Sequence, residues 1–177
     1  RYAAAWARQH TEICTATSVR KEQSAAVMDR QMQCMMRARS TLQATAEVLQ
    51  RADATVVRRA ARIASGMPPL QRCLDAEQLD RDAPPPVPEG HADTVAALRE
   101  QIARAHALRL AGRAEESRAL AADVVDDARP LDYPPVLVAA LLRLAYAHVE
   151  LGADDDARTA LREAIDLGIR RGPTKLG

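Results

Sequence analysis

The chain has 177 residues, enough for one domain or for two small domains that each bury a core. Its 25 Lys and Arg residues balance 24 Asp and Glu residues without a basic block, which argues against a nucleic-acid partner. No uninterrupted run of the roughly 18 apolar residues that a transmembrane helix needs is present, so we expect no membrane span within these residues.

Hydrophobic residues make up 47% of the chain but aromatic residues only 2%, and Ala and Leu, both strong helix formers, carry much of the apolar share. Apolar residues recur at helical spacing, and no stretch alternates as a half-buried strand would. We therefore predict an all-α fold. The chain starts at Arg1 without Met, so we expect it to be a piece of a longer protein.

The sequence pattern in the first half of the chain predicts a series of helices. One runs from about Tyr2 to Val19, and a long second helix begins near Ser24, its N-cap, and continues to about Arg51. Asp53 should cap a third helix that ends near Ser65, before "GMPPL", and a short helix, "LQRCLDAEQL", follows. Within the second helix a seam spaced for helix pairing is predicted at Met28, Met32, Met35, Arg39, Leu42, Ala46 and Leu49.

The stretch "DRDAPPPVPEG" has the composition of a linker, with four prolines and a glycine between charged residues. We predict an N-terminal helical bundle at 1–79, a Pro-rich linker at 80–90 and a second helical region at 91–177. That second region contains an internal repeat: laying Gly112 on Gly152 aligns 109–125 with 149–165 at a period of 40 residues. Each copy reads as a helix, a glycine turn and a second helix.

This repeat resembles the tetratricopeptide (TPR) pattern, with "LAG" and "ELG" entering the turns and Ser117 and Ala157 at the small position of the second helices. The resemblance implies two TPR-like hairpins that extend an α-solenoid. We expect the open end after Leu167 to be covered by a further repeat in the full protein or by self-association through the last helix.

The motifs "YAAAWARQHTEIC", "ATSVRKEQS", "MDRQMQCM", "RADATVVRRA" and "MPPLQRCLD" resemble a family of bacterial serine/threonine protein kinases, in the region between the catalytic domain and the TPR repeats. Lys21 stands where that family usually has Gly, and Gln31 where it usually has Arg. The resemblance implies a non-catalytic, regulatory protein–protein interaction module of a signalling protein. The resemblance leaves the compartment open: such a module would lie in the bacterial cytoplasm, or outside it if a membrane helix precedes it in the parent protein.

No Gly-rich phosphate loop, strand-borne Lys, "HRD" or "DFG" element occurs in the sequence, so we expect no enzyme activity and no cofactor in this chain. A parent kinase would carry its catalytic domain upstream. An alternative is a ligand-sensing helical domain, in which the bundle binds a small molecule and the repeats relay the signal. A pocket lined by Trp6, His10 and the Met seam would favour that alternative.

Three of the five methionines and one cysteine cluster in "MQCMM", a set of soft ligands that could bind Cu(I). Their helical spacing favours core packing instead. The cysteine spacing matches no zinc pattern. Cys14 and Cys34 would converge across an antiparallel pair of helices, so they form either a disulfide or buried free thiols, and Cys73 either pairs outside this chain or stays free.

A TPR superhelix binds peptides on the concave face that the first helix of each hairpin provides. The residues predicted on this face are Arg99, Ile102, His106, Arg109 and Leu110 in one repeat and Leu142, Tyr146, Val149 and Glu150 in the next. Here Arg99 and Arg109 would grip the carboxylates of a protein or peptide partner, with Tyr146 as an anchor. The other interpretation is that these residues pack on the N-terminal bundle or form solvated surface.

Overall fold

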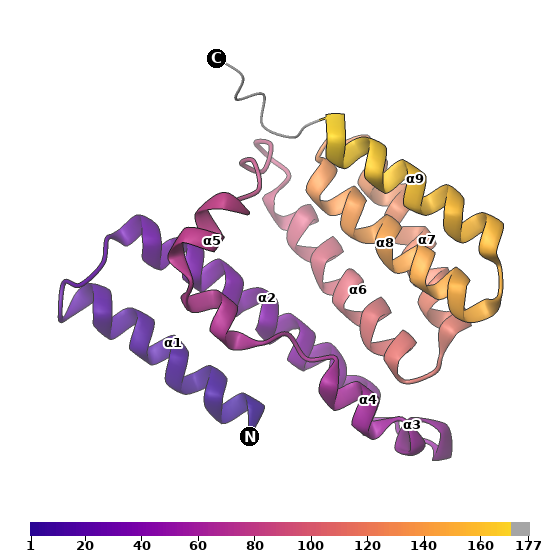
Figure 1. The fold of residues 1–177 in the computed structure, drawn as a ribbon, viewed down its shortest axis with the longest axis horizontal. Coiled ribbons are helices and arrows are strands. Elements are labelled where there is room, and N and C mark those ends of the chain that lie inside the picture. The colour runs from indigo at the N-terminus through magenta and orange to yellow at the C-terminus, as the bar shows by residue number, and fades with distance from the viewer. Residues whose placement is uncertain (171–177) are drawn as a thin grey trace.

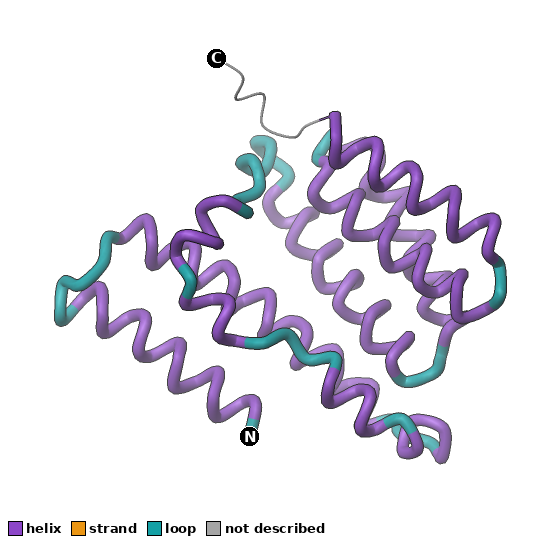
Figure 2. Tube along the Cα trace, viewed as in Figure 1, coloured by secondary structure: helices purple, strands orange, loops and turns teal. Residues whose placement is uncertain are grey.

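A computed structural model describes residues 1–170, and this part of the chain is helical without strands (Figures 1 and 2), which confirms the predicted all-α class. Residues 171–177, the last part of the predicted repeat region, lie outside the described residues. The elements are α1 (Tyr2–Ser18), α2 (Ala25–Gln50), α3 (Ala54–Arg58), α4 (Ala60–Ser65), the 3₁₀ helix η1 (Leu70–Leu74), α5 (Ala76–Arg81), α6 (Ala92–Leu110), α7 (Ala114–Ala128), the 3₁₀ helix η2 (Arg129–Leu131), α8 (Pro134–Leu151) and α9 (Asp154–Arg170).

Side-chain caps begin two helices where the sequence predicts them. The Ser24 hydroxyl accepts the Val27 backbone N–H at 3.3 Å, and the Asp53 carboxylate accepts two backbone N–H groups at the start of α3. Between α1 and α2 the backbone of Lys21 has a φ of 56°, in the left-handed region. Glycine adopts this conformation without a Cβ penalty, whereas a lysine there carries one.

Gly112 and Gly152, with φ values of 86° and 74°, form the turns of two helical hairpins, as predicted. The predicted small positions are buried: Ser117 and Ala157 are 1% and 3% exposed. The Ser117 hydroxyl also donates a hydrogen bond of 2.7 Å to the carbonyl of Ala105, across the α6–α7 hairpin. A larger side chain at either position would push the paired helices apart.

Three clusters of buried side chains hold the helices together. The first lies among α6, α7, α8 and α9, the second joins α2, α3 and α4 to α6, and the third joins α1 and α2 to η1. Residues on both sides of the Pro-rich segment therefore share the second core. The segment itself is held against the repeats, because the Tyr133 hydroxyl donates to the Pro85 carbonyl at 3.0 Å and Val87 packs on the first core.

The buried stripe of α2 differs from the predicted seam beyond Met35. Met28 and Met32 pack on the third core and Met35 is fully buried, whereas Arg39, Ala46 and Leu49 are exposed. The buried positions are Gln31, Met35, Ala38, Ala44, Thr45 and Val48. The reason is that α2 changes partners along its length, from α1 and η1 at its start to α6 in its second half.

Helices α2, α6 and α8 lie side by side, with α7 and α9 forming the second helices of the hairpins (Figure 1). Contacts of Arg99 with Tyr133 and of Arg109 with Glu150 show that α6 and α8 run in parallel, as the first helices of stacked hairpins do. Among residues 1–170, α8 alone is long and apolar enough to cross a membrane by length and composition. It packs against α6, α7 and α9, so its apolar residues are explained by their burial in the first core.

Candidate functional site

The predicted concave-face residues separate into five environments. Arg99, Ile102 and His106 line a cleft, and Arg109, Tyr146 and Glu150 form a cluster of their own. Leu110 is buried in the second core, which excludes it from a binding surface in this conformation. Leu142 packs partly buried against the first core, and Val149 is exposed.

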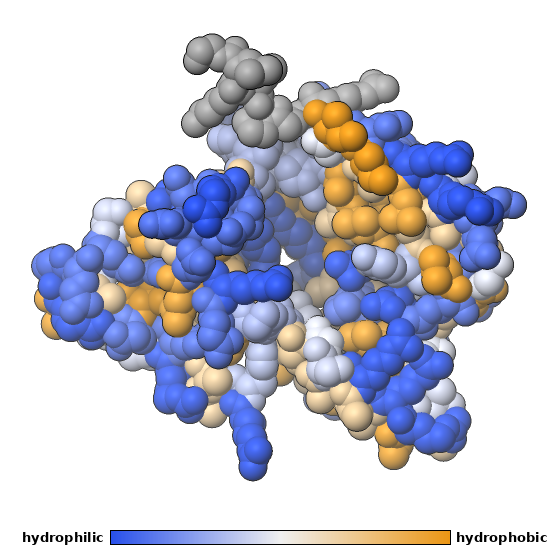
Figure 3. Space-filling view, viewed as in Figure 1, coloured by the Kyte–Doolittle hydropathy of each residue, from blue (hydrophilic) through white to orange (hydrophobic). Residues whose placement is uncertain are grey.

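The cleft has a volume of about 730 Å³ and lies between α2, α6 and α8. Figure 3 shows the surface hollowed between the α2 side and the α6–α9 side of the molecule. The apolar part of the lining comes from Met32, Met36, Pro84, Ala96, Ile102, Ala103, Pro135, Val136 and Ala139, and the polar part from Asp29, Gln33, Arg37, Ser40, Thr41, Arg99, Glu100, His106 and Arg143. The face predicted to be concave is thus partly open and partly walled by α2.

Arginines from three helices line this cleft: Arg37 from α2, Arg99 from α6 and Arg143 from α8. Burial lowers the pKa of Arg37, and the nearby positive charge of Arg99 lowers it further. The pKa of Arg143 is lowered by burial and then by the charge of Arg109. Both guanidinium groups stay charged because the ordinary pKa of arginine is so high, but their charge is held in a less favourable environment than water.

His106 fixes the position of Arg143 at one end of the cleft. The Arg143 guanidinium donates to Nδ1 of His106 at 2.9 Å, and Nε2 of the ring donates to the Gly66 carbonyl at 3.4 Å. Burial lowers the pKa of His106 to about 4, with the positive charges of Arg143 and Arg109 adding to the effect. The imidazole is therefore neutral near pH 7 and serves as an acceptor for Arg143.

Glu150 lies at the centre of a separate cluster that ties α4 to α6 and α8. Its carboxylate pairs with Arg109 at 2.6 Å, with Arg62, and with Arg59 at 3.9 Å. The Arg109 guanidinium also lies 5.4 Å from the centre of the Tyr146 ring. The predicted role of Arg109 in gripping a partner's carboxylate is wrong for this conformation, because Glu150 of the same chain already occupies its guanidinium.

The disulfide of the structure joins Cys34 to Cys73, with the two Cα atoms 5.4 Å apart, and leaves Cys14 as a free thiol. The hypothesis of a Cys14–Cys34 bridge is therefore wrong. It considered α1 and α2 as an isolated pair, whereas η1 folds back across α2 and brings Cys73 against Cys34. Because Cys34 is bridged, its sulfur is no thiolate ligand for a soft metal.

The methionines around Cys34 divide between core and cleft. Met28, Met32 and Met35 contribute to the third core, as the packing interpretation predicts, while Met36 is 46% exposed and lines the cleft. Trp6, whose indole N–H donates to the Met35 carbonyl at 2.7 Å, belongs to this core rather than to the lining of the cleft. Residues 1–170 contain no group of three or more His, Cys, Asp and Glu side chains that could hold a metal ion.

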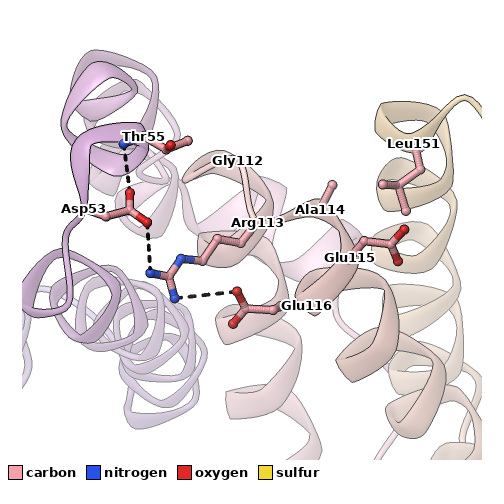
Figure 4. A pocket seen from close by; sticks show the side chains of 8 residues that line it. All are labelled: Asp53, Thr55, Gly112, Arg113, Ala114, Glu115, Glu116 and Leu151. Carbon is pink, nitrogen blue, oxygen red and sulfur yellow. Dashed lines mark hydrogen bonds and ion pairs between the residues drawn. The ribbon is translucent and has the colours of Figure 1, made fainter.

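A shallower pocket of about 490 Å³ lies where α3 meets the turn between α6 and α7 (Figure 4). At its edge Arg113 pairs with Asp53 and with Glu116, at 3.6 Å in each case. Asp53 is at the same time the N-cap of α3, and backbone hydrogen bonds from Val56 and Thr55 lower its pKa. These charges have structural partners, so the pocket offers no evident reactive group.

Sequence reasoning missed Arg37 and Arg143, the cleft arginines outside its predicted set. Arg143 had a signal, because it is the one charged residue in the otherwise apolar stretch 134–147. Arg37 had none, since its role depends on α2 packing beside α6. No family model, curated protein or solved structure matches this chain.

Proposed function

We propose that this chain is a non-catalytic protein-interaction module, the regulatory TPR-like region of a bacterial serine/threonine protein kinase-type signalling protein. The observation that carries the proposal is the cleft between α2 and the first helices of the two hairpins, α6 and α8. Helical repeats use this face to bind extended or helical peptides. The sequence motifs of the N-terminal half support the kinase-type context.

The lining of the cleft suits a peptide partner. Part of its lining is apolar, with an exposed methionine, Met36, that can adapt its shape to different side chains. Its polar side chains lie on the helices α2, α6 and α8, where they can select among partners. His106, which lines this cleft, uses both ring nitrogens in hydrogen bonds, with Arg143 and with the Gly66 carbonyl.

Selection from a random library of displayed 14-residue peptides tests the interaction function. We expect binders that lose affinity when the cleft is filled by Ala139→Trp, because Ala139 lines the cleft wall. Ala119→Trp, on the exposed side of α7, is the matched control and should leave binding unchanged. If all selected peptides bind the Ala139→Trp variant as well as the parent, the cleft is not the interaction site.

Ligand sensing is the second candidate, and the size of the cleft favours it specifically. A volume of about 730 Å³ falls within the range of pockets that bind small molecules. The site differs from the one predicted for sensing, because Trp6 and His10 stack on each other in the bundle rather than line the cleft. Native mass spectrometry of the purified chain against a metabolite mixture tests this candidate, with Ala139→Trp again as the blocking variant.

A further inference from the structure

The arginines of this protein differ in whether the chain itself supplies a carboxylate partner. Arg59, Arg62 and Arg109 share Glu150, Arg129 pairs with Glu163, and Arg113 pairs with Asp53 and Glu116. Within residues 1–170, Arg37, Arg99 and Arg143 have no such ion pair, although all three line one cleft. Their hydrogen-bond partners are neutral: the Gln33 carbonyl, the Tyr133 hydroxyl and His106.

Two carboxylates also line the cleft, Asp29 on α2 and Glu100 on α6. Neither forms an ion pair with the three arginines in the described part of the chain, so the guanidinium groups remain available. Arg37 and Arg99 lie close enough for their like charges to repel each other, which destabilises the empty site. An anion placed between them would remove this repulsion and form charge-assisted hydrogen bonds.

The three charges are spread along the cleft rather than gathered at one point. Arg99 and His106, the contact residue of Arg143, are seven positions apart on α6, which is about 10 Å at 1.5 Å per residue. Apolar residues of both hairpins line the same cleft, with Ile102 and Ala103 on α6 and Val136 and Ala139 on α8. A single small anion would therefore satisfy only one end.

We propose that the occupant of the cleft is an acidic peptide segment, with carboxylates that pair with Arg37 and Arg99 at one end and with Arg143 at the other, and with apolar side chains between them. This inference rests on the proposed interaction function and names its partner class. Arg37 comes from α2, outside the hairpins, so the recognition site combines the N-terminal region with the repeats.

The peptide selection described above, repeated at 50 mM and 500 mM NaCl, provides the probe. We expect selected sequences to be enriched in Asp and Glu flanking apolar residues, and to bind more weakly at the higher salt concentration. Arg37→Glu and Arg99→Glu should each weaken the binding of a selected acidic peptide by about tenfold or more. Arg104→Glu, on an exposed position of the same helix α6, is the matched control and should have little effect.

Exchanging the charges of the peptide and the protein distinguishes a lost contact from a variant that is misfolded. A peptide in which Lys replaces the acid that pairs with Arg99 should bind the Arg99→Glu variant and lose affinity for the parent protein. Equal melting temperatures of parent and variants would show that the variants are folded. Selected peptides whose binding is blocked by Ala139→Trp but whose sequences are not enriched in Asp and Glu would overturn this inference. The proposed interaction function would then still hold. Binders that ignore the cleft altogether would overturn both, as would capture of free glutamate or phosphate alone by the cleft.

Discussion

The guanidinium of Arg109 lies 2.6 Å from the carboxylate of Glu150, and this pair joins the C-terminal ends of α6 and α8. The side chains are only 15% and 19% exposed, so the pair is largely shielded from water. Arg62 of α4 reaches the same carboxylate. One acid therefore connects the N-terminal helices to both repeats, and a single substitution can test how strongly these parts depend on each other.

Glu150→Gln should destabilise the protein by about 2–4 kcal/mol, because it leaves Arg109 and its neighbours without their counter-charge. Urea unfolding followed by circular dichroism measures the change. Glu163→Gln is the matched control: its partner Arg129 is half exposed, and such surface pairs contribute about 1 kcal/mol or less. Equal losses for the two variants would contradict a structural role for the Glu150 cluster.

Stability should fall as the pH decreases from about 6.5 to about 4, in part because of His106. The pKa of this group is about 4 in the folded state, below the ordinary value of 6.5, so the unfolded chain binds the proton more readily across this interval. The contribution of His106 to the free energy of unfolding is fully present above pH 6.5 and is lost progressively towards pH 4. This contribution amounts to about 2 kcal/mol once the partial solvent exposure of the ring is allowed for.

The His106→Gln variant isolates this effect, because glutamine keeps hydrogen-bonding capacity but does not titrate. Unfolding free energies of parent and variant at several pH values between 4 and 7 should converge as the pH falls. Parallel curves for the two proteins would show that His106 does not titrate as the structure indicates.

Loss of the Cys34–Cys73 bridge should cost about 4 kcal/mol, the chain-entropy value for a loop with a sequence separation of 39 residues. Cys73→Ser under oxidising conditions should therefore unfold at a markedly lower urea concentration than the parent, whereas Cys14→Ser should change little because that thiol is free. Non-reducing peptide mapping checks the pairing directly. A peptide that links Cys14 to Cys34 would contradict the structure.

Two glycine-to-alanine substitutions should have opposite effects. A Cβ at Gly66 would overlap Cδ1 of the buried Leu110, so Gly66→Ala should destabilise the protein by about 1–3 kcal/mol through overpacking. At Gly168, inside α9, a Cβ meets nothing within 4 Å, and Gly168→Ala should stabilise the helix by about 0.5–1 kcal/mol. Thermal unfolding of the two variants measures both, and a tolerated Gly66→Ala would place α4 further from α6 than in the structure.

Local sequence features were sufficient to predict most of the helical organisation. Ser24 and Asp53 act as caps because their side chains accept hydrogen bonds from backbone N–H groups two or three residues away. Gly112 and Gly152 form turns because a turn with positive φ depends on the conformation of the glycine itself. The burial of Ser117 and Ala157 also follows from the local spacing within each hairpin. Such short-range preferences act whatever the rest of the fold does.

Tertiary structure alone decided the contacts between segments distant in sequence. Cys34 had two possible partners, and only the return of η1 across α2 places Cys73 beside it. Arg109 and Arg99 looked equivalent as exposed cations of the concave face, yet Glu150 neutralises the first while the second stays unpaired in a cleft with Arg37. Helical periodicity indicates which side of a helix is apolar, but the partner that each side meets depends on how the helices pack, and that packing is a property of the whole chain.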